Sequence, residues 1–217
     1  RTMIPPPIYM DFAATTPCLP EVVQAMLPYF TQYFGNEASS THAYGWQAKA
    51  AVESATATIA SYLNCICEEI IFTSGATEAC NLAIRGVASA YQNKGKHIIT
   101  SKIEHKAVLD TCKNLEKQGY QITYLDVDSN GFIPIDSIKN SIQHHTILIA
   151  IQYANNETGV LQNIQEIGRI AKDHNILFFT DATQAIGKLD IDVEKLQVDL
   201  LCMSAHKIYG PKGVGAL

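Results

Sequence analysis

From residue 69 onward, short apolar runs alternate with amphipathic stretches along the chain. This alternation is typical of repeated βα units packed around a largely parallel sheet. The run at 146–153 is apolar on both faces, as expected of a strand that helices cover on both sides. Strands are therefore expected at residues 69–74, 97–101, 121–127, 146–153, 176–181 and 199–203. Helices are expected at residues 77–93, 105–118, 134–143, 164–174 and, as a short one, 193–197.

The first 68 residues follow a different pattern, with helices predicted at 20–34 and 43–63 and Asn64 ending the second. Gly95 and Gly119 fall where glycine commonly ends a helix. A last strand is expected at 214–217, at an edge of the sheet. The predicted fold class is α/β, a three-layer α/β/α sandwich with a mostly parallel central sheet. We expect one domain, in which residues 1–68 form a helical arm and residues 69–217 the βα repeats.

Composition and charge exclude several classes of function. The 217 residues are 47% hydrophobic and 17% charged, with a formal net charge of −5. This balance argues against non-specific binding to nucleic acid or to anionic membranes. No apolar stretch reaches the roughly 18 residues of a transmembrane helix, and residues 1–7 lack the apolar core of a signal peptide. A soluble, cytoplasmic protein is expected.

Six cysteines are scattered through segments of different predicted structure, at positions 18, 65, 67, 80, 112 and 202. Cys65 and Cys67 are the only close pair, and this spacing without a second pair or nearby histidines is a poor metal signal. Free structural thiols are therefore expected in a reducing compartment, and no metal site.

The polar groups that follow the predicted strands point to one ligand, because ligands of open α/β sheets bind beyond the carboxyl ends of the strands. After the first strand, a small-residue turn at 74–78 opens a helix, where free N–H groups and the Thr77 hydroxyl suit a phosphate. An ordinary helix cap is the alternative. His105 opens the next helix and could stack on an aromatic ligand or shuttle a proton, or be an exposed first-turn histidine.

Two charged groups sharpen this picture. Asp181 ends a run so apolar that its burial requires a cationic partner, and a protonated pyridinium nitrogen is one. Lys207 follows an apolar strand and precedes a glycine-rich turn, where a partly desolvated amine can form a Schiff base with an aldehyde. Taken alone, Lys207 is better explained as a solvated loop lysine beside a Gly-Pro turn. Together with the other strand ends, it predicts a site for pyridoxal 5'-phosphate.

Five motifs carry a family resemblance, at residues 74–78 (Ser-Gly-Ala-Thr-Glu), 104–108 (Glu-His-Lys-Ala-Val), 155–157 (Asn-Asn-Glu), 181–184 (Asp-Ala-Thr-Gln) and 204–213 (Ser-Ala-His-Lys-Ile-Tyr-Gly-Pro-Lys-Gly). In order and spacing they resemble the cysteine desulfurases, pyridoxal-phosphate enzymes of fold type I in aminotransferase class V. The segments 9–17 and 34–36 also look like that family. The similarity covers essentially the whole chain. It is closer to the housekeeping iron–sulfur-assembly branch of the family than to the branch whose phosphate motif reads Arg-Gly-Thr-Thr-Glu.

The resemblance implies a role for each motif. Lys207 would hold the cofactor and then move protons at the substrate α-carbon, while His105 would stack on the ring and assist proton transfer. Asp181 would pair with the ring nitrogen and Gln184 with the phenolic oxygen. Asn156, or equally its neighbour Asn155, would lie near that oxygen and the substrate carboxylate. The phosphate would be bound by Ala76, Thr77, Ser204 and His206.

The resemblance also implies the reaction and its partners. L-cysteine would be converted to L-alanine, with sulfur held as a persulfide on a separate enzyme cysteine and passed to acceptor proteins, in a homodimer. That cysteine, an arginine for the substrate carboxylate and the smaller carboxyl-terminal domain are missing here, so a truncated chain without turnover of its own is expected. Another class V enzyme, an aminotransferase or a selenocysteine lyase, or a non-catalytic fragment are the alternatives.

Overall fold

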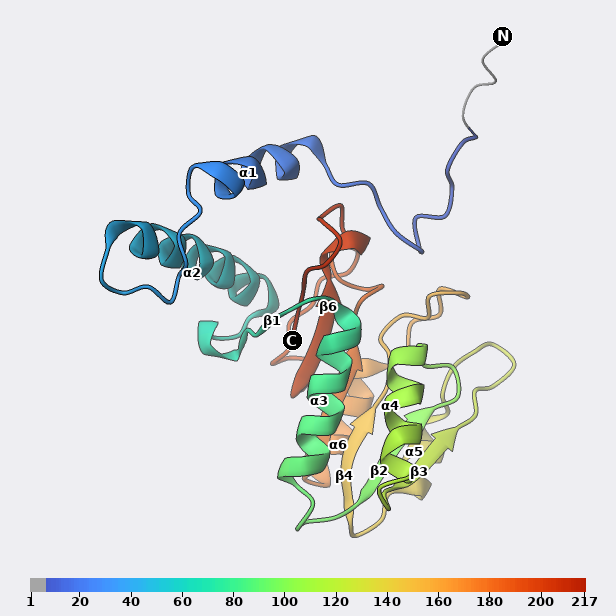
Figure 1. Cartoon of the computed structure of the whole chain (residues 1–217). Helices are drawn as coiled ribbons and strands as arrows, with labels where there is room; N and C mark the ends of the chain where they lie inside the picture. Colours follow the sequence, from blue (N-terminus) through green and yellow to red (C-terminus); the bar gives the residue numbers. More distant parts are fainter. Residues whose placement is uncertain (1–6) are drawn as a thin grey trace.

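A seven-stranded sheet forms the centre of the molecule in the computed structural model, which describes residues 7–217 (Figure 1). Residues 1–6, which belong to the segment without a signal-peptide core, lie outside the described part. The strand order is β1-β7-β6-β5-β4-β2-β3. The strands are β1 (Phe72–Thr73), β2 (His97–Ser101), β3 (Gln121–Leu125), β4 (Thr146–Ala150), β5 (Leu177–Asp181), β6 (Leu200–Ser204) and β7 (Gly215–Ala216).

The strands from β6 through β3 run parallel, whereas β7 is antiparallel to both of its neighbours. β2 and β4 are buried at every position, because helices cover both faces of the sheet. Helices α3 (Ala76–Ala90) and α4 (Lys106–Glu116) pack on one face, in front of the sheet in Figure 1. Helices α5 (Ile135–Ser141) and α6 (Ile164–Asp173) pack on the other. The predicted three-layer α/β/α fold class is confirmed.

Two further helices, α1 (Pro20–Thr31) and α2 (Ala43–Leu63), stand beside the sheet rather than on it (Figure 1). No residue of α1 is buried. The end of α2 docks through Leu63, which packs beside Ile186, and through Tyr62, whose hydroxyl donates to the Leu189 carbonyl at 3.1 Å. Among residues 7–217, no helix combines the length and apolar character needed to cross a membrane.

Most predicted elements form within a few residues of their expected limits, and helix 43–63 and strand 97–101 match at both ends. The helix expected at 20–34 ends at Thr31. The strand expected at 69–74 is reduced to Phe72–Thr73, because Cys67–Glu69 form a turn of 3-10 helix. Strand 214–217 is not an edge: β7 lies between β6 and β1, and Ile71 and Leu217 exchange backbone hydrogen bonds at 2.8 Å.

Of the three residues expected to end helices, two do so and one does not. Asn64 ends α2 in the left-handed conformation, with φ 57°, as predicted. Gly119, with φ 86°, closes α4 through a hydrogen bond from Tyr120 N–H to the Leu115 carbonyl. Gly95 is not a cap: a Cβ there would lie 2.0 Å from the His145 carbonyl oxygen, so the close approach of the segments that lead into β2 and β4 requires this glycine.

The helix expected at 193–197 does not form. Those residues make a hydrogen-bonded turn in which Val198 N–H donates to the Val193 carbonyl and Gln197 N–H to the Glu194 carbonyl. Gln197 has φ 54°, and this left-handed residue ends the turn before a second helical turn can start.

Candidate functional site

One cavity of about 550 Å³ opens beyond the carboxyl ends of the parallel strands. Its wall combines side chains from five separate strand ends, as expected for an open α/β sheet. Each candidate cofactor residue from the sequence lines it: Ala76, Thr77, His105, Asn156, Asp181, Gln184, Ser204, His206 and Lys207. The cavity has the size of a small-molecule site, with polar groups that converge from different elements.

The amino-terminal end of α3 forms one wall. Gly75 precedes it with φ 152° and ψ 178°, a conformation essentially restricted to glycine. The Ala76 and Thr77 amides belong to the first turn, whose N–H groups have no partner within the helix. The carboxylate of Glu78 accepts from the Ser74 N–H and hydroxyl at 2.6 Å, so it turns back on the preceding loop. This end of α3 therefore offers free amides to an anion.

Strand β7 holds this turn in place. A Cβ on Gly215 would lie 2.6 Å from Gly75 Cα and 2.6 Å from the Met203 carbonyl oxygen. Only glycine allows β7 to run this close to both the turn and β6. The geometry of the turn before α3 thus depends on Gly215.

Asp181 lies at the end of β5 and is buried. Its carboxylate accepts from the Thr183 N–H at 3.0 Å and from the Cys202 thiol at 3.3 Å. These donors keep the carboxylate in place. It is a buried anion that lines the cavity, and so it favours a cationic group of a bound ligand.

Lys207 lies in a short 3-10 helix, Ala205–Lys207, directly after β6. Burial lowers the pKa of its amine, and the negative charge of Asp181 opposes that shift. Its Nζ donates to the Ala13 carbonyl at 2.7 Å. A partly buried amine with a lowered pKa is the form of lysine that reacts with aldehydes.

The segment before α1 closes one side of the cavity, and its contacts were not foreseen from the sequence. The Ala13 carbonyl also accepts from Gln184 Nε2 at 2.8 Å. Thr15 Oγ1 lies 3.0 Å from His206 Nδ1, and the Thr16 N–H donates to the His206 carbonyl at 2.8 Å. These partners are 171 to 191 residues apart in sequence, so their spacing does not indicate the contacts; only the family-like segment 9–17 marked the region.

His206 contributes little positive charge to the cavity. Burial, with the positive charges of Lys207 and Lys212, lowers the pKa of its imidazole. At neutral pH the ring therefore stays neutral and binds through hydrogen bonds. Lys212, which also lines the cavity, supplies a positive charge that was not foreseen.

His105 is the amino-terminal cap of α4. Its Nδ1 accepts from the Ala107 N–H at 3.1 Å, so in the neutral ring the proton is on Nε2. The cap fixes the ring at the cavity wall and leaves Nε2 for a ligand. Gln152, which the sequence did not indicate, lies nearby and donates to the Ile103 carbonyl at 2.7 Å.

The two adjacent asparagines have different positions. Asn155 is buried, and its Oδ1 accepts from the N–H groups of Glu157 and Thr158 at 3.0 and 2.9 Å. It organises the turn after β4. Asn156 lines the cavity, so of the two it is the one placed to contact a ligand.

Glu104 lies behind His105 and was also missed as an individual residue. Its carboxyl is buried, and Oε1 accepts from the Ser101 hydroxyl at 2.6 Å and the Gln152 N–H at 3.0 Å. Oε2 has no hydrogen-bond partner among the described residues. Burial raises the pKa of this carboxyl to about 8. It is a neutral acid at neutral pH that supports the loop carrying His105.

Curated proteins from several bacteria are similar in sequence to this chain. The cysteine desulfurase IscS of Neisseria meningitidis serogroup C is 56% identical over 211 residues, covering 97% of this chain and 52% of that protein. The protein of the same name from Shewanella denitrificans is 53% identical over 213 residues, covering 97% and 53%. The chain spans about half the length of the curated relatives it matches.

Solved structures share its backbone. The structure described as "SspA in complex with cysteine" is 44% identical with a TM-score of 0.93, covering 96% of this chain and 60% of that one. A "NIFS-LIKE PROTEIN" is 39% identical with a TM-score of 0.93, covering 96% and 57%. The profile of the family described as aminotransferase class-V matches residues 8–217, which include every strand end that lines the cavity. This chain therefore belongs to the aminotransferase class V family.

Proposed function

We propose that this chain is the cofactor-binding part of a cysteine desulfurase, which uses pyridoxal 5'-phosphate to convert L-cysteine to L-alanine and passes the sulfur on. The observation that carries the proposal is the placement of Lys207 and Asp181 in one cavity with the free amides of α3. The identity of more than half to proteins named cysteine desulfurase supports the choice of reaction within class V. The cysteine bound in a solved structure that is 44% identical supports the substrate.

The residues present fit the cofactor. Its phosphate matches the amides of Ala76 and Thr77, with Ser204 and His206 facing the same cavity. Its ring nitrogen, when protonated, matches the buried carboxylate of Asp181. Its aldehyde matches the amine of Lys207, whose pKa is lowered by burial. When bound, the cofactor supplies an electron sink for the α-carbon of an amino acid.

The chain's own residues would then divide the work. Lys207 would hold the cofactor and, when free of it, would move a proton at the substrate α-carbon. His105 is held by its cap bond so that the ring faces the cavity and Nε2 is available for proton transfer. Asp181 would keep the ring nitrogen protonated, and Gln184 and Asn156, which line the same cavity, would contact the ring oxygen and the substrate carboxylate.

Sulfur capture is not assigned to any of the six cysteines. Cys80 is the one that lines the cavity, but it is fully buried and packs against Cys202, with the sulfur atoms 3.3 Å apart. A nucleophile that reaches the substrate sulfur needs access and a thiolate. We infer that residues 1–217 alone bind the cofactor without turning over cysteine. We also propose a homodimer and acceptor proteins of the iron–sulfur-assembly type as partners.

Trapping the Schiff base tests the proposal. The protein is loaded with pyridoxal 5'-phosphate, reduced with borohydride, and mapped by peptide mass spectrometry, and alanine formed from L-cysteine is measured in the full-length protein. We expect the label on Lys207, and both label and alanine to be lost in Lys207→Ala. Lys102→Ala is the matched control, because Lys102 pairs with Asp126 at 2.7 Å outside the cavity. A label on another lysine, or transamination without alanine, would refute the assignment.

A further inference from the structure

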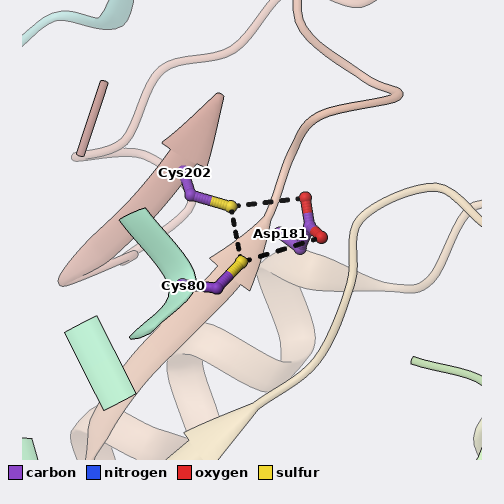
Figure 2. Close-up of side chains that lie close together, drawn as sticks. All are labelled: Cys80, Asp181 and Cys202. Carbon is purple, nitrogen blue, oxygen red and sulfur yellow. Dashed lines mark hydrogen bonds between the residues drawn. The ribbon is translucent and has the colours of Figure 1, made fainter. Parts of the chain in front are cut away.

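A cluster of three buried side chains lies under the floor of the cavity: Cys80 from α3, Asp181 from the end of β5 and Cys202 from β6 (Figure 2). The two sulfur atoms are 3.3 Å apart. Cys202 Sγ lies 3.3 Å from Asp181 Oδ1, and Cys80 Sγ lies 4.0 Å from Asp181 Oδ2. The proposed function uses the carboxylate but neither thiol.

We propose that Cys80, Cys202 and Asp181 form a binding site for a thiophilic divalent cation such as Zn²⁺. Two sulfur ligands and one carboxylate oxygen suit zinc, whereas Mg²⁺ and Ca²⁺ prefer oxygen ligands alone. On binding, the cation displaces a proton from each thiol, and the two protons leave to solvent. No electron transfer is involved.

The spacing of the ligand atoms supports a metal. Zinc–sulfur bonds of about 2.3 Å and zinc–oxygen bonds of about 2.0 Å in a tetrahedron place sulfurs about 3.8 Å apart and sulfur and oxygen about 3.5 Å apart. The sulfurs are 3.3 Å apart and Cys202 Sγ lies 3.3 Å from Asp181 Oδ1, each within about half an ångström of these values. Cys80 Sγ lies 4.0 Å from the other oxygen, Oδ2, and the two sulfurs and one carboxylate oxygen all lie within 4.8 Å of one another. A disulfide needs the sulfurs at about 2.05 Å, a much larger movement for two side chains held in a packed core. The triangle thus fits a cation better than a disulfide.

The surroundings leave room for a fourth ligand. Cys80 and Asp181 line the cavity, so a water molecule can complete the tetrahedron from that side. Three anionic ligands around a divalent cation leave one net negative charge, and Lys207 and Lys212 line the same cavity. The frame is rigid, because Asp181 and Cys202 are paired neighbours on β5 and β6.

No sequence motif marks this site. Its members are 21, 101 and 122 residues apart, and only the folding of α3 onto β5 and β6 brings them together. The single close pair in the sequence, Cys65 and Cys67, lies elsewhere, so cysteine spacing does not indicate the cluster.

A consequence for loading rests on the proposed function. Asp181 would be a ligand to the cation and also the partner of the cofactor ring nitrogen. Because a divalent cation on one oxygen of Asp181 repels a protonated ring nitrogen at the other, cation and cofactor should exclude each other. The chain would then take up pyridoxal phosphate only when the cation is absent.

A cobalt titration tests the site directly. The cofactor-free, reduced full-length protein is titrated with Co²⁺ alone, and the thiolate-to-cobalt charge-transfer band in the near ultraviolet is followed. We expect one equivalent to bind and Zn²⁺ to displace it. Cys80→Ser and Cys202→Ser should each weaken binding by more than the roughly 10–100-fold that changes outside the ligand set cost. Cys112→Ser is the matched control, a buried thiol on α4 outside the cluster, and should bind like the parent.

Circular dichroism checks the fold of each variant, and the two serine variants test the site independently if one of them does not fold. Absence of the band, equal loss in Cys112→Ser, or a band that needs Cys65 and Cys67 would overturn the proposal. So would the loss of two hydrogens from the cluster peptides, which would identify a disulfide. A missing cobalt band with normal labelling of Lys207 refutes the cation site and leaves the proposed function intact. Normal cofactor uptake by the Zn²⁺-loaded protein refutes only the exclusion.

Discussion

Replacing Glu104 by glutamine should change how the stability of the protein depends on pH. Glu104 ends in a buried carboxyl whose Oε1 accepts two hydrogen bonds and whose Oε2 has no partner among the described residues. In the unfolded chain the carboxyl ionises near its ordinary pKa of 4.5, but burial raises its pKa to about 8 in the folded protein. Between these values the folded state holds a proton that the unfolded state has lost. Stability therefore falls as the pH rises.

The gap between the two pKa values corresponds in full to about 5 kcal/mol, with a slope of about 1.4 kcal/mol per pH unit. His97 and His206 change stability with the opposite sign, mainly below their ordinary pKa of 6.5. In the window from pH 6.5 to 8 we therefore expect Glu104 to give a fall of about 2 kcal/mol. Glutamine keeps the acceptor for Ser101 and Gln152 but cannot ionise, so this contribution should disappear.

Urea unfolding of the cofactor-free protein, followed by far-ultraviolet circular dichroism at pH 6.5, 7.25 and 8, measures the effect. Near pH 6.5 Glu104→Gln should be less stable by about 1–3 kcal/mol, because its amide nitrogen is buried without an acceptor. The difference should shrink as the pH rises. Glu53→Gln, at an exposed position of α2 paired with Lys49, should run parallel to the parent. A constant difference between Glu104→Gln and the parent would show that Glu104 is ionised in the folded protein.

Two further predictions concern the turn at the cavity and the far end of the sheet. Gly215→Ala should lower stability by about 1–3 kcal/mol and weaken cofactor binding, because its Cβ would meet backbone atoms of Gly75 and Met203; unchanged melting and titration curves would contradict this. Gly86→Ala on α3, where a Cβ has open space, is the control. Burial and His145 lower the pKa of His97 to about 4, so the unfolded chain binds a proton below pH 6.5 that the folded state refuses. His97→Gln should reduce the loss of stability between pH 6.5 and 4 in thermal melts. A melting temperature that falls with acid as steeply as in the parent would contradict this.

The elements that the sequence predicted well are those whose local pattern is unambiguous. β2 and β4 are apolar on both faces, and α2 ends at Asn64, which tolerates the left-handed conformation. The direction of β7 could not be predicted, because a two-residue strand has the same apolar pattern in parallel and antiparallel pairing. The prediction of a helix at 193–197 was wrong because tertiary packing determines the conformation of this segment. It packs closely on α6: a Cβ on Gly168 would lie 2.1 Å from the Leu196 carbonyl oxygen.

The chemistry at the strand ends was more predictable than the contacts around it. Asp181 is costly to place at the end of a buried strand unless it binds a partner, so its position alone carried information, whereas Lys207 gained its meaning from the other strand ends. The Ala13 carbonyl has no such signal, because every residue has a carbonyl. The cluster of Cys80 and Cys202 also escapes, since nothing local to either thiol indicates the other.

The segment before α1 lies along one side of the cavity, and its Ala13 carbonyl accepts a hydrogen bond from Lys207. If Lys207 bonds to the cofactor as proposed, it would give up its hydrogen bond to the Ala13 carbonyl, a net cost of about 1 kcal/mol. This segment stays bound to the cavity wall, because Thr16 N–H and Oγ1 both donate to the His206 carbonyl, at 2.8 and 2.9 Å. Tyr209 N–H in turn donates to Thr16 Oγ1 at 2.8 Å. Release of the lysine is therefore a local event, and the hydrogen bonds that hold the cavity wall do not depend on the state of the reactive amine.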